Sequence, residues 1–279
     1  MIDPQLIEEQ IGPFLREDIG FGDLTSTIMI DADATGVFDI KAREPLTVAG
    51  IDVAAAVFRR CEPGCTFEIC VQDGDMVDAG TVMARVSGRA RGILTGERTA
   101  LNLLQHLSSI ATYTAQFVAE IEDTGTQLID TRKTTPGLRA FEKHAVTCGG
   151  GRNHRLALDG GVLIKDNHIA VAGSLTAAIR RAKSQVPTLI KVQVECDTLD
   201  QVREAIEAGA DSLLLDNMSP DTMGEAVSIV GNRIPLEASG GITLETIRAK
   251  AESGVEFIST SKITQSAPAV DIGLDEATD

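Results

Sequence analysis

Two patterns of hydrophobic and polar positions divide the chain. Between about residues 35 and 86, apolar and polar residues alternate in short runs separated by turn residues such as Asp73-Gly74-Asp75. Period-two alternation with Gly and Asp breaks is typical of antiparallel strands with one solvent-exposed face. The strands that it predicts cover residues 37–43, 65–71 and 81–86, and a helical pattern over residues 51–60 interrupts them.

A long helix is predicted from Glu97 to about Asp123. Its apolar positions form one broad stripe of Leu101, Leu104, Leu107, Ile110, Ala111 and Tyr113. Polar residues at its start make it amphipathic, so we expect a buried helix that connects two parts of the chain, not a membrane element.

Beyond this helix the chain repeats strand, polar loop and helix. The predicted strands are residues 127–130, 161–164, 189–194, 212–215, 234–238 and 256–259. Helix caps are readable as a Thr198/Gln201 capping box, Ser219 before Pro220, and a helix from Thr243 to a closing Gly254. Alternating short strands and helices predict a parallel sheet with right-handed crossovers, and about six such units fit a barrel better than an open sheet. No G-x-G-x-x-G follows the first strand, so a dinucleotide-binding fold has no support.

Composition excludes several classes of function. A net charge of −16 with no Trp and one Tyr argues against nucleic-acid binding. No apolar run is long enough to span a bilayer, and the N-terminal residues lack the pattern of a secretory signal. We interpret the five cysteines as reduced structural thiols of a cytoplasmic protein, in preference to a metal site.

One segment, residues 130–169, is basic within this acidic chain. It has four acidic residues against seven basic ones, namely Arg132, Lys133, Arg139, Lys143, Arg152, Arg155 and Lys165, and it holds three of the four histidines. A solvated basic face fits poorly, because basic pairs alternate with glycines and apolar runs. The segment therefore predicts a binding site for a small, highly charged anion.

Polar residues recur where the predicted barrel strands end. They are Arg132-Lys133, Lys165-Asp166, Glu195, Asp216-Asn217 and Ser239-Gly240-Gly241. The C-terminal strand ends of a β/α barrel meet at one mouth, where catalysis takes place. Helix capping explains one or two of these positions, such as Asp216, but not Lys165, which we expect at a point where the strand is still buried.

The residue types indicate the ligand. Arg offers a planar fork for carboxylate or phosphate, and Lys a compact charge. The segments Ser239-Gly-Gly and 259–262 can present backbone amides to a phosphate ahead of a helix. Glu195 and Asp216 can hold Mg²⁺ through water, as sites for phosphorylated substrates commonly do.

Seven motifs spread over nearly the whole chain closely resemble the quinolinate phosphoribosyltransferase family. They are residues 17–26 (EDIGFGDLTS), 97–102 (ERTALN), 130–139 (DTRKTTPGLR), 149–155 (GGGRNHR), 163–168 (LIKDNH), 215–218 (LDNM) and 237–242 (EASGGI). The resemblance implies an α/β fold with an N-terminal α/β sandwich and a C-terminal, incomplete β/α (TIM-like) barrel. We place the sandwich and connecting helix in residues 1–110 and the barrel in residues 111–267, with a tail, 268–279, that can return to the sandwich.

The resemblance also implies a reaction. Quinolinate and phosphoribosyl pyrophosphate would give nicotinate mononucleotide, pyrophosphate and CO₂, a step that feeds NAD biosynthesis. It implies Mg²⁺ with phosphoribosyl pyrophosphate, no organic cofactor, and a homodimer or higher even oligomer whose subunits share active sites.

Site roles carry over by position. Arg132, His154, Arg155 and Lys165 would bind the quinolinate carboxylates, with Arg98 of the partner subunit. Lys133 would touch both substrates, and Glu195 and Asp216 would face the ribose hydroxyls and Mg²⁺. Ser239, Gly240, Gly241, Ser261 and Lys262 would bind the 5′-phosphate. Of these we assign Lys133, Lys165, Glu195 and Asp216 to catalysis. The family usually shows a Gly-Ala-Leu-Thr-like run where this chain has Ser261-Lys262-Ile263-Thr264, and Lys262 can compensate electrostatically.

Three alternatives stay open at this point. A nicotinate-using phosphoribosyltransferase would need one carboxylate clamp, whereas this chain offers several. A non-catalytic, molybdate-transport-associated relative should lack the Lys165–His168 motif, which is intact here. A biotinyl-like scaffold, suggested by residues 73–80, would need a lysine at a hairpin tip, and none is present there.

Overall fold

The computed structural model describes residues 2–277, which divide into two compact units. The first contains Met1–Ala115, Thr135–Gly150 and Ala267–Asp279, and the second contains Gln116–Thr134 and Gly151–Ser266. In the part of the chain that is described, no helix is long and apolar enough to cross a membrane.

The first unit is built on a four-stranded antiparallel sheet in the order β12-β1-β5-β3. The strands are β1 (Thr35–Ala42), β3 (Thr66–Ile69), β5 (Val82–Arg89) and β12 (Ile272–Glu276), and β2 (Leu46–Thr47) pairs with β4 (Met76–Val77) in a smaller sheet. The antiparallel strands predicted from period-two alternation are confirmed. Because β12 pairs with β1, the tail after residue 267 returns to this sheet, as far as residue 277 is described.

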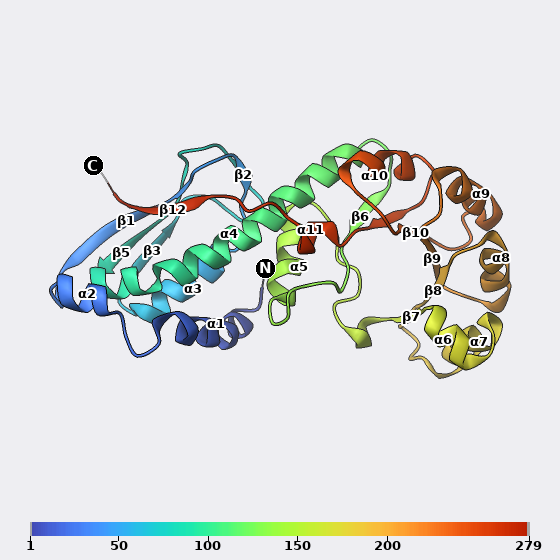
Figure 1. Cartoon of the computed structure of the whole chain (residues 1–279), viewed down its shortest axis with the longest axis horizontal. Helices are drawn as coiled ribbons and strands as arrows, with labels where there is room; N and C mark the ends of the chain where they lie inside the picture. The colour runs from blue at the N-terminus through green and yellow to red at the C-terminus, as the bar shows by residue number, and fades with distance from the viewer. Residues whose placement is uncertain (1, 278–279) are drawn as a thin grey trace. The chain divides into compact units, whose positions relative to one another are not determined.

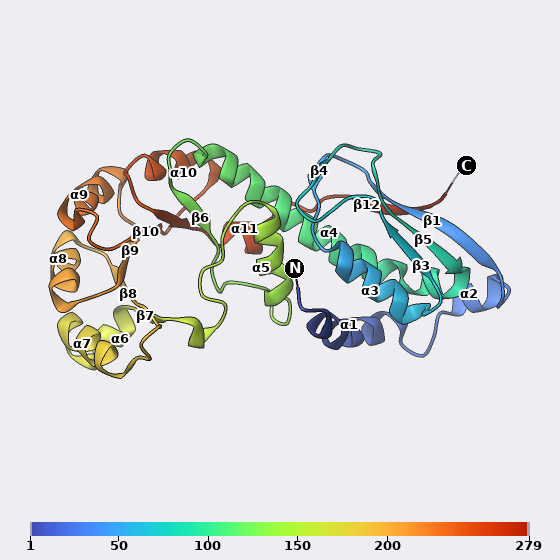
Figure 2. The same cartoon turned by 180° about the vertical axis from the view of Figure 1, so that it is seen from behind.

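Helices cover one face of the sheet, as Figures 1 and 2 show for α3 (Ile51–Cys61) and the first part of α4 (Ala90–Ile121). Phe58 of α3 stacks on Phe67 of β3 with ring centroids 5.9 Å apart. Helix α1 (Pro4–Ile19) turns its buried residues Ile7, Ile11 and Leu15 inward, and a short helix, α2 (Leu24–Met29), follows it. The result is the predicted α/β sandwich.

Helix α4 begins at Ala90, seven residues before the predicted start at Glu97. The first part of the helix was not predicted because it contains Gly92 and Gly96, and glycine is a poor helix former. Both are needed for close packing: a Cβ on Gly92 would lie 2.7 Å from Glu62 Cβ, and one on Gly96 would lie 3.2 Å from Cys61 Sγ.

The second unit is a six-stranded parallel sheet in the order β6-β11-β10-β9-β8-β7. Its strands are β6 (Gln127–Ile129), β7 (Val162–Ile164), β8 (Val192–Cys196), β9 (Ser212–Asp216), β10 (Leu236–Ser239) and β11 (Phe257–Ser259). Its helices are α6 (Asp166–Ala172), α7 (Leu175–Gln185), α8 (Leu199–Ala208), α9 (Pro220–Val230), α10 (Leu244–Ala251) and α11 (Lys262–Gln265), with a 3-10 turn η1 (Leu158–Gly160). Helices α7 to α10 line the convex side of the curved sheet (Figures 1 and 2), which is the architecture of an incomplete β/α barrel.

The helix caps of this unit follow the sequence closely. Gln201 N donates to Thr198 Oγ1 at 3.2 Å and Thr198 N donates to Gln201 Oε1 at 3.2 Å, so the predicted capping box is confirmed. Ser219 caps α9 ahead of Pro220, also as predicted. The third strand was placed too early: residues 187–190 form a turn, Leu189 is exposed, and β8 starts only at Val192.

Residues 135–150 lie in the first unit, although we expected residues 111–267 to form the barrel as one stretch. They carry α5 (Arg139–Cys148), which packs on α4. The buried carboxylate of Glu142 accepts from His106 Nε2 at 2.9 Å, and a Cβ on Gly149 would lie 2.3 Å from the carbonyl oxygen of Ala111. This packing, which no local pattern reveals, assigns the segment to the first unit.

Gly149→Ala should therefore destabilise the protein. We expect a loss of about 2–3 kcal/mol in the free energy of unfolding, because the added methyl group collides with backbone that cannot move independently. Gly224→Ala in α9 is the matched control, since nothing lies within 4 Å of its added Cβ, and it should stabilise by up to about 1 kcal/mol. Urea denaturation of both variants checks this, and equal stability of the two would contradict the packing.

Candidate active site

The register of the parallel strands places acidic residues side by side on one face of the sheet. Glu195 of β8 pairs with Leu214 of β9, which in turn pairs with Glu237 of β10. Asp216 follows Leu214 by two residues, so it lies on the same face, nearer the C-terminal ends of the strands. Three neighbouring strands thus deliver a carboxylate each to the concave side.

Lys165 directly follows β7 and pairs with Glu195. Ile164 lies opposite Val194, so the residues that follow them, Lys165 and Glu195, are also neighbours. Lys165 Nζ contacts Glu195 Oε2. The side chain of Lys165 is 45% exposed and that of Glu195 14%. The expectation that Lys165 lies on a buried stretch of strand was wrong, because β7 ends at Ile164 and Lys165 is the N-cap of α6. His168, in the first turn of α6, accepts the Lys165 backbone N–H on Nδ1 at 3.0 Å.

His154 lies beside a carboxylate in the interior of the second unit. Its Nε2 lies 2.9 Å from Gln193 Oε1 and 3.4 Å from Glu237 Oε2, and Gln193 Nε2 donates to the same Glu237 oxygen at 2.7 Å. The Glu237 carboxylate raises the pKa of His154 above its ordinary value, against the opposing effect of burial. Asp130, fully buried, accepts the backbone N–H of His154 at 2.8 Å and so fixes this loop against the end of β6.

Two arginines complete the cation cluster. Arg155 donates from Nη1 to the carbonyl oxygen of Gly161 at 2.7 Å, and burial, together with the charge of Arg132, lowers the pKa of its guanidinium. The Nε of Arg132 is buried and has no hydrogen-bond partner within residues 2–277. Arg155, His154, Gln193 and Glu237 line a cavity of about 260 Å³. Its lining also includes the first residues of β7, β9 and β11, and it does not include Arg132 or Lys165. Cations held close together with an unsatisfied donor are what an anionic ligand would stabilise.

A glycine loop follows β10 beside Asp216. Gly240 and Gly241 both have positive φ, 86° and 63°, and a Cβ on Gly240 would lie 2.1 Å from Asn217 Oδ1, so only glycine fits there. Asn217 N donates to the carbonyl oxygen of Ser239 at 3.0 Å, and Asn217 Nδ2 donates to Asp216 Oδ2 at 2.7 Å. Lys250 of α10 donates to the carbonyl oxygen of Gly240 at 2.7 Å.

The remaining barrel residues lie after the neighbouring strands β6 and β11. Ser259 of β11 pairs with Ile129 of β6, so the loops that carry Lys133 and Lys262 start side by side. Thr264 Oγ1 donates to the carbonyl oxygen of Lys133 at 2.8 Å and ties α11 to the loop after β6. Both lysine side chains are exposed, and Ser261 stands at the N-cap of α11.

Arg98 belongs to the first unit. It lies on α4 and lines a hollow of about 310 Å³ with Asp18, Asp23 and Leu24. Thr95, one turn before it, donates to Asp23 Oδ2 at 3.1 Å.

Sequence reasoning gave no role to Gln193, Glu237, Asp130 or Lys250. Glu237 could have been identified from the sequence, because it is an acidic residue within the apolar strand Leu236-Glu237-Ala238. Gln193 could have been identified too, because it is polar and alternates with apolar residues in the same strand as Glu195. The hydrogen bond of Asp130 joins residues 24 apart in the sequence and that of Lys250 residues 10 apart, across loops whose path no repeating pattern of residues predicts.

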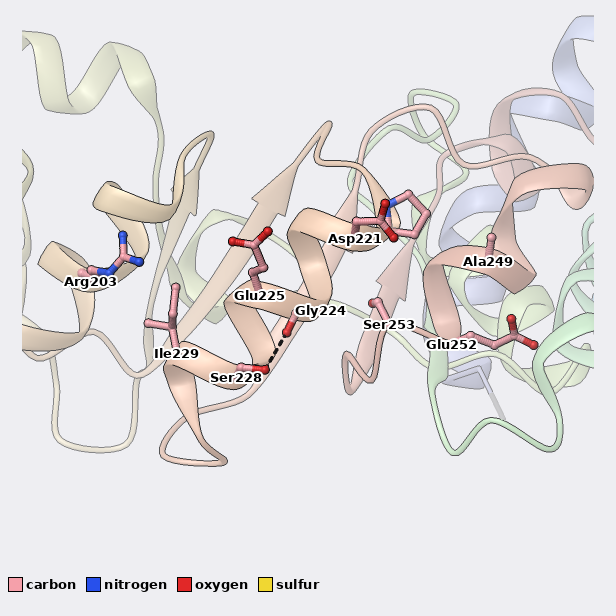
Figure 3. Close-up of a pocket in the computed structure, with 10 residues that line it drawn as sticks. Arg203, Asp221, Gly224, Glu225, Ser228, Ile229, Ala249, Glu252 and Ser253 are labelled. Atoms are coloured by element: carbon pink, nitrogen blue, oxygen red, sulfur yellow. Dashed lines mark hydrogen bonds between the residues drawn. The ribbon is translucent and has the colours of Figure 1, made fainter.

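A larger hollow, of about 750 Å³, lies among the outer helices and serves as a contrast (Figure 3). Its lining comes from α8, α9 and α10 and includes Asp221, Glu225 and Glu252 with the single cation Arg203. Such an acidic surface repels anions, and none of the residues that the sequence assigns to the site lines it.

Fold and site together define a class: a β/α barrel enzyme that gathers charged side chains at the ends of its parallel strands. The family model described as quinolinate phosphoribosyl transferase, C-terminal domain, matches residues 110–275, and that of the N-terminal domain matches residues 23–108. The chain belongs to the quinolinate phosphoribosyltransferase family.

Similar proteins agree in sequence and in structure. A probable nicotinate-nucleotide pyrophosphorylase (carboxylating) of Synechocystis is 42% identical over 96% of this chain and 92% of its own length. The corresponding protein of Bacillus subtilis is 41% identical over 96% and 93%. The crystal structure of NadC from Streptococcus pyogenes superposes with a TM-score of 0.95 at 36% identity, over 100% of this chain and 99% of that one. The nicotinate-nucleotide pyrophosphorylase of Francisella tularensis gives a TM-score of 0.94 at 37% identity, over 99% and 97%.

Glu237→Gln should lower the pKa of His154. The main cause that raises this pKa is the hydrogen bond from the imidazole to the Glu237 carboxylate, and the negative charge of Glu237 adds to it; the amide keeps the shape of the carboxylate but loses this charge. We expect the His154 resonance in an NMR titration to move to lower pH. Because the folded pKa is raised, the stabilisation from the pair is fully present below the unfolded-state pKa of about 6.5 and is lost as pH rises through the folded value.

Glu195→Gln is the control for this titration. It removes a carboxylate of the same layer that pairs with Lys165, so the pKa of His154 should stay in place. An unchanged His154 titration in Glu237→Gln would rule out the charge pair as its cause.

Proposed function

We propose that this enzyme transfers the phosphoribosyl group of phosphoribosyl pyrophosphate to quinolinate with decarboxylation, and so makes nicotinate mononucleotide, pyrophosphate and CO₂ for NAD biosynthesis. The observation that carries the proposal is the set of cationic side chains Arg132, His154, Arg155 and Lys165. The Glu237 carboxylate raises the pKa of His154, and the Nε of Arg132 is buried without a hydrogen-bond partner among the described residues. Two carboxylates on adjacent carbons of one small ring need this many cations. The names of the similar proteins support the same reaction.

Quinolinate binding would redistribute the ion pairs of the site. Lys165 is paired with Glu195 and His154 with Glu237, so both side chains are held in place before any ligand arrives. The substrate carboxylates would share these cations and satisfy Arg132. A preorganised cluster of this kind needs little rearrangement when the anion binds.

Glu195 and Asp216 fit the role of ribose and Mg²⁺ ligands. Both carboxylates lie on the concave face of neighbouring strands, and Asp216 is hydrogen-bonded to Asn217, which leaves other lone pairs available. Mg²⁺ is usually held by one or two carboxylates, waters and substrate phosphates, and when bound it would offset the charge of the departing pyrophosphate. The pairing of Glu195 with Lys165 favours an ion that arrives with the phosphorylated substrate.

The glycine loop after β10 fits the 5′-phosphate. Gly240 and Gly241 have backbone conformations that can turn amides toward an anion, and Ser239, Ser261 and Lys262 lie after the adjacent strands β10 and β11. Lys133 lies after β6, the next strand beyond β11, where it can reach both substrates.

The chemistry requires no covalent protein intermediate. The pyridine nitrogen forms a bond to the anomeric carbon of the ribose while the bond from that carbon to pyrophosphate breaks. The carbon is cation-like in the transition state, so the carboxylates of Glu195 and Asp216 can stabilise it. When CO₂ leaves, the electron pair of the broken bond stays on the adjacent ring carbon, where the positive charge of the quaternised nitrogen stabilises it, and that carbon then takes a proton from solvent.

We also propose a homodimer that shares its active sites through Arg98. The leucine stripe of α4 is not available for an interface, because Leu101, Leu104 and Leu107 are buried within the chain. Beside the Arg98 hollow, however, the segment around α2 exposes a set of large apolar residues. They are Phe21 (114%), Leu24 (76%), Ile28 (75%) and Met29 (76%). Such a patch is characteristic of a protein interface. The five free thiols fit our placement of the enzyme in the cytoplasm.

The first test is a product assay. With quinolinate, phosphoribosyl pyrophosphate and Mg²⁺, we expect nicotinate mononucleotide and CO₂ in equal amounts, and little turnover of nicotinate. Lys165→Ala should lower kcat/KM at least about thirty-fold, because it leaves a substrate carboxylate without its partner. Lys183→Ala is the control, since Lys183 on α7 pairs with Asp211 on the outer side of the barrel. Equal turnover of nicotinate, or no release of CO₂, would refute the assignment.

Arg98 is tested by complementation. Arg98→Ala and Lys165→Ala homodimers should each be nearly inactive, whereas a mixed dimer regains one intact site. If half of the dimers are mixed, we expect about a quarter of the wild-type activity. Two separately prepared Lys165→Ala samples, mixed in the same way, serve as the control. No recovery after verified subunit exchange would mean that Arg98 acts within its own subunit or not at all.

A further inference from the structure

We propose that Asp73, His144 and Cys148 form a binding site for a Zn²⁺-like divalent transition-metal ion, which lies wholly in the first unit. The three side chains do not take part in the proposed reaction. One ligand atom from each, a carboxylate oxygen, an imidazole nitrogen and a sulfur, lies within 4.8 Å of the other two. This convergence is the observation that the inference rests on.

Two elements bring the ligands together. His144 and Cys148 lie four residues apart on α5, so they face the same side of the helix. Asp73 lies in the turn between β3 and β4. His144 Nε2 is 2.7 Å from Asp73 Oδ2 and 3.4 Å from Cys148 Sγ. The turn also approaches the helix closely, with the Cβ position of Gly74 3.6 Å from the carbonyl oxygen of Cys148.

A cysteine nucleophile activated by His144 is a poor explanation of the cluster. In a catalytic triad the acid and the nucleophile contact different ring nitrogens, whereas here both contact Nε2. Three donors around a single point are instead the arrangement of a metal site.

Asp73 is fixed by contacts of its second oxygen. Its Oδ1 accepts the backbone N–H groups of Gly50 at 2.9 Å and Ile51 at 3.0 Å, at the start of α3. This leaves Oδ2 for the ion and sets its direction. Outer hydrogen bonds that orient a ligand in this way are a regular part of metal sites.

The surroundings leave room for further ligands. The cluster borders a hollow of about 390 Å³ whose lining also includes Asp52, Gln72 and Thr147. A water or a side chain from this hollow can supply a fourth ligand. The side chains of His144 and Asp73 are 13% and 20% exposed, so an ion can enter but would be well shielded.

A mixed set of nitrogen, sulfur and oxygen donors selects among metals. Thiolate and imidazole favour Zn²⁺, or Co²⁺ as its probe, whereas Mg²⁺ and Ca²⁺ prefer oxygen ligands alone. Tetrahedral bonds of about 2.1 Å would widen the separation of Nε2 and Oδ2 to roughly 3.4 Å, a small movement of an exposed turn. Once bound, the ion would clamp the β3–β4 turn and the start of α3 to α5.

Cobalt titration of the chelator-treated full chain is the direct test. We expect one equivalent of Co²⁺ to give tetrahedral d–d bands and a thiolate-to-cobalt charge-transfer band, and Zn²⁺ to displace both. Zn²⁺ at 100-fold excess over its Kd should raise the Tm by roughly 5 °C.

Variants separate this site from adventitious binding. Cys148→Ser should abolish the charge-transfer band and His144→Gln should prevent stoichiometric binding, with circular dichroism showing that both fold. Cys70→Ser, at an exposed thiol outside the cluster, and Glu195→Gln, at the proposed Mg²⁺ site, should keep the full spectrum. Substoichiometric cobalt in the wild type, or an unchanged band in Cys148→Ser, would overturn the proposal, whatever the product assay shows.

Discussion

The register of the parallel strands β7 to β10 is the constraint on which the active site depends. Side chains alternate between the two faces of a strand, so one residue of slippage would turn Lys165, Glu195 and Asp216 toward the helices. It would also bring Val194 and Leu215, both fully buried, to the polar concave face. The hydrophobic layer under α7 to α10 therefore fixes which charged residues meet, and the chemistry of the site follows from the packing of the opposite face.

Within that register the site resolves a conflict of charge. Cations gathered for an anionic substrate repel one another when no substrate is present. Burial, and then the charge of Arg132, lower the pKa of Arg155. The carboxylates of Glu195 and Glu237 offset this repulsion. Among residues 2–277 they pair with a lysine and a histidine, not with the two arginines, which we propose as ligands of the substrate carboxylates. An overall charge of −16 is thus compatible with anion binding, because the acidic residues nearest the cations hold them in place.

Much of this arrangement could be predicted from the sequence, for physical reasons that differ between its parts. Period-two alternation and capping residues such as Thr198 and Ser219 are local signals, and the elements that they predicted formed. The strand ends also delivered Lys165, Glu195 and Asp216 to one face, because parallel strands share a direction. The pairing of His154 with Glu237 could not be predicted, since it joins a loop to strand β10, more than 80 residues away, through a buried contact. The early start of α4 was missed because Gly92 and Gly96 are chosen for close packing, against helix propensity.

The basic segment 130–169 shows how a charge count along the sequence can mislead. We interpreted its cations as one anion site, but residues 135–150 belong to the first unit and the rest of the segment belongs to the barrel. Lys143 is 2% exposed, and His144 contacts Asp73. The three adjacent glycines mark the change: Gly149 packs against the backbone of α4, and Gly150 adopts a φ of 84° directly before the barrel resumes at Gly151. A segment that resembles a single motif therefore serves two units. The cations of this segment that we assign to the reaction lie after β6 and on either side of β7. Within α5 the segment contributes to packing and, as we propose, to a metal site.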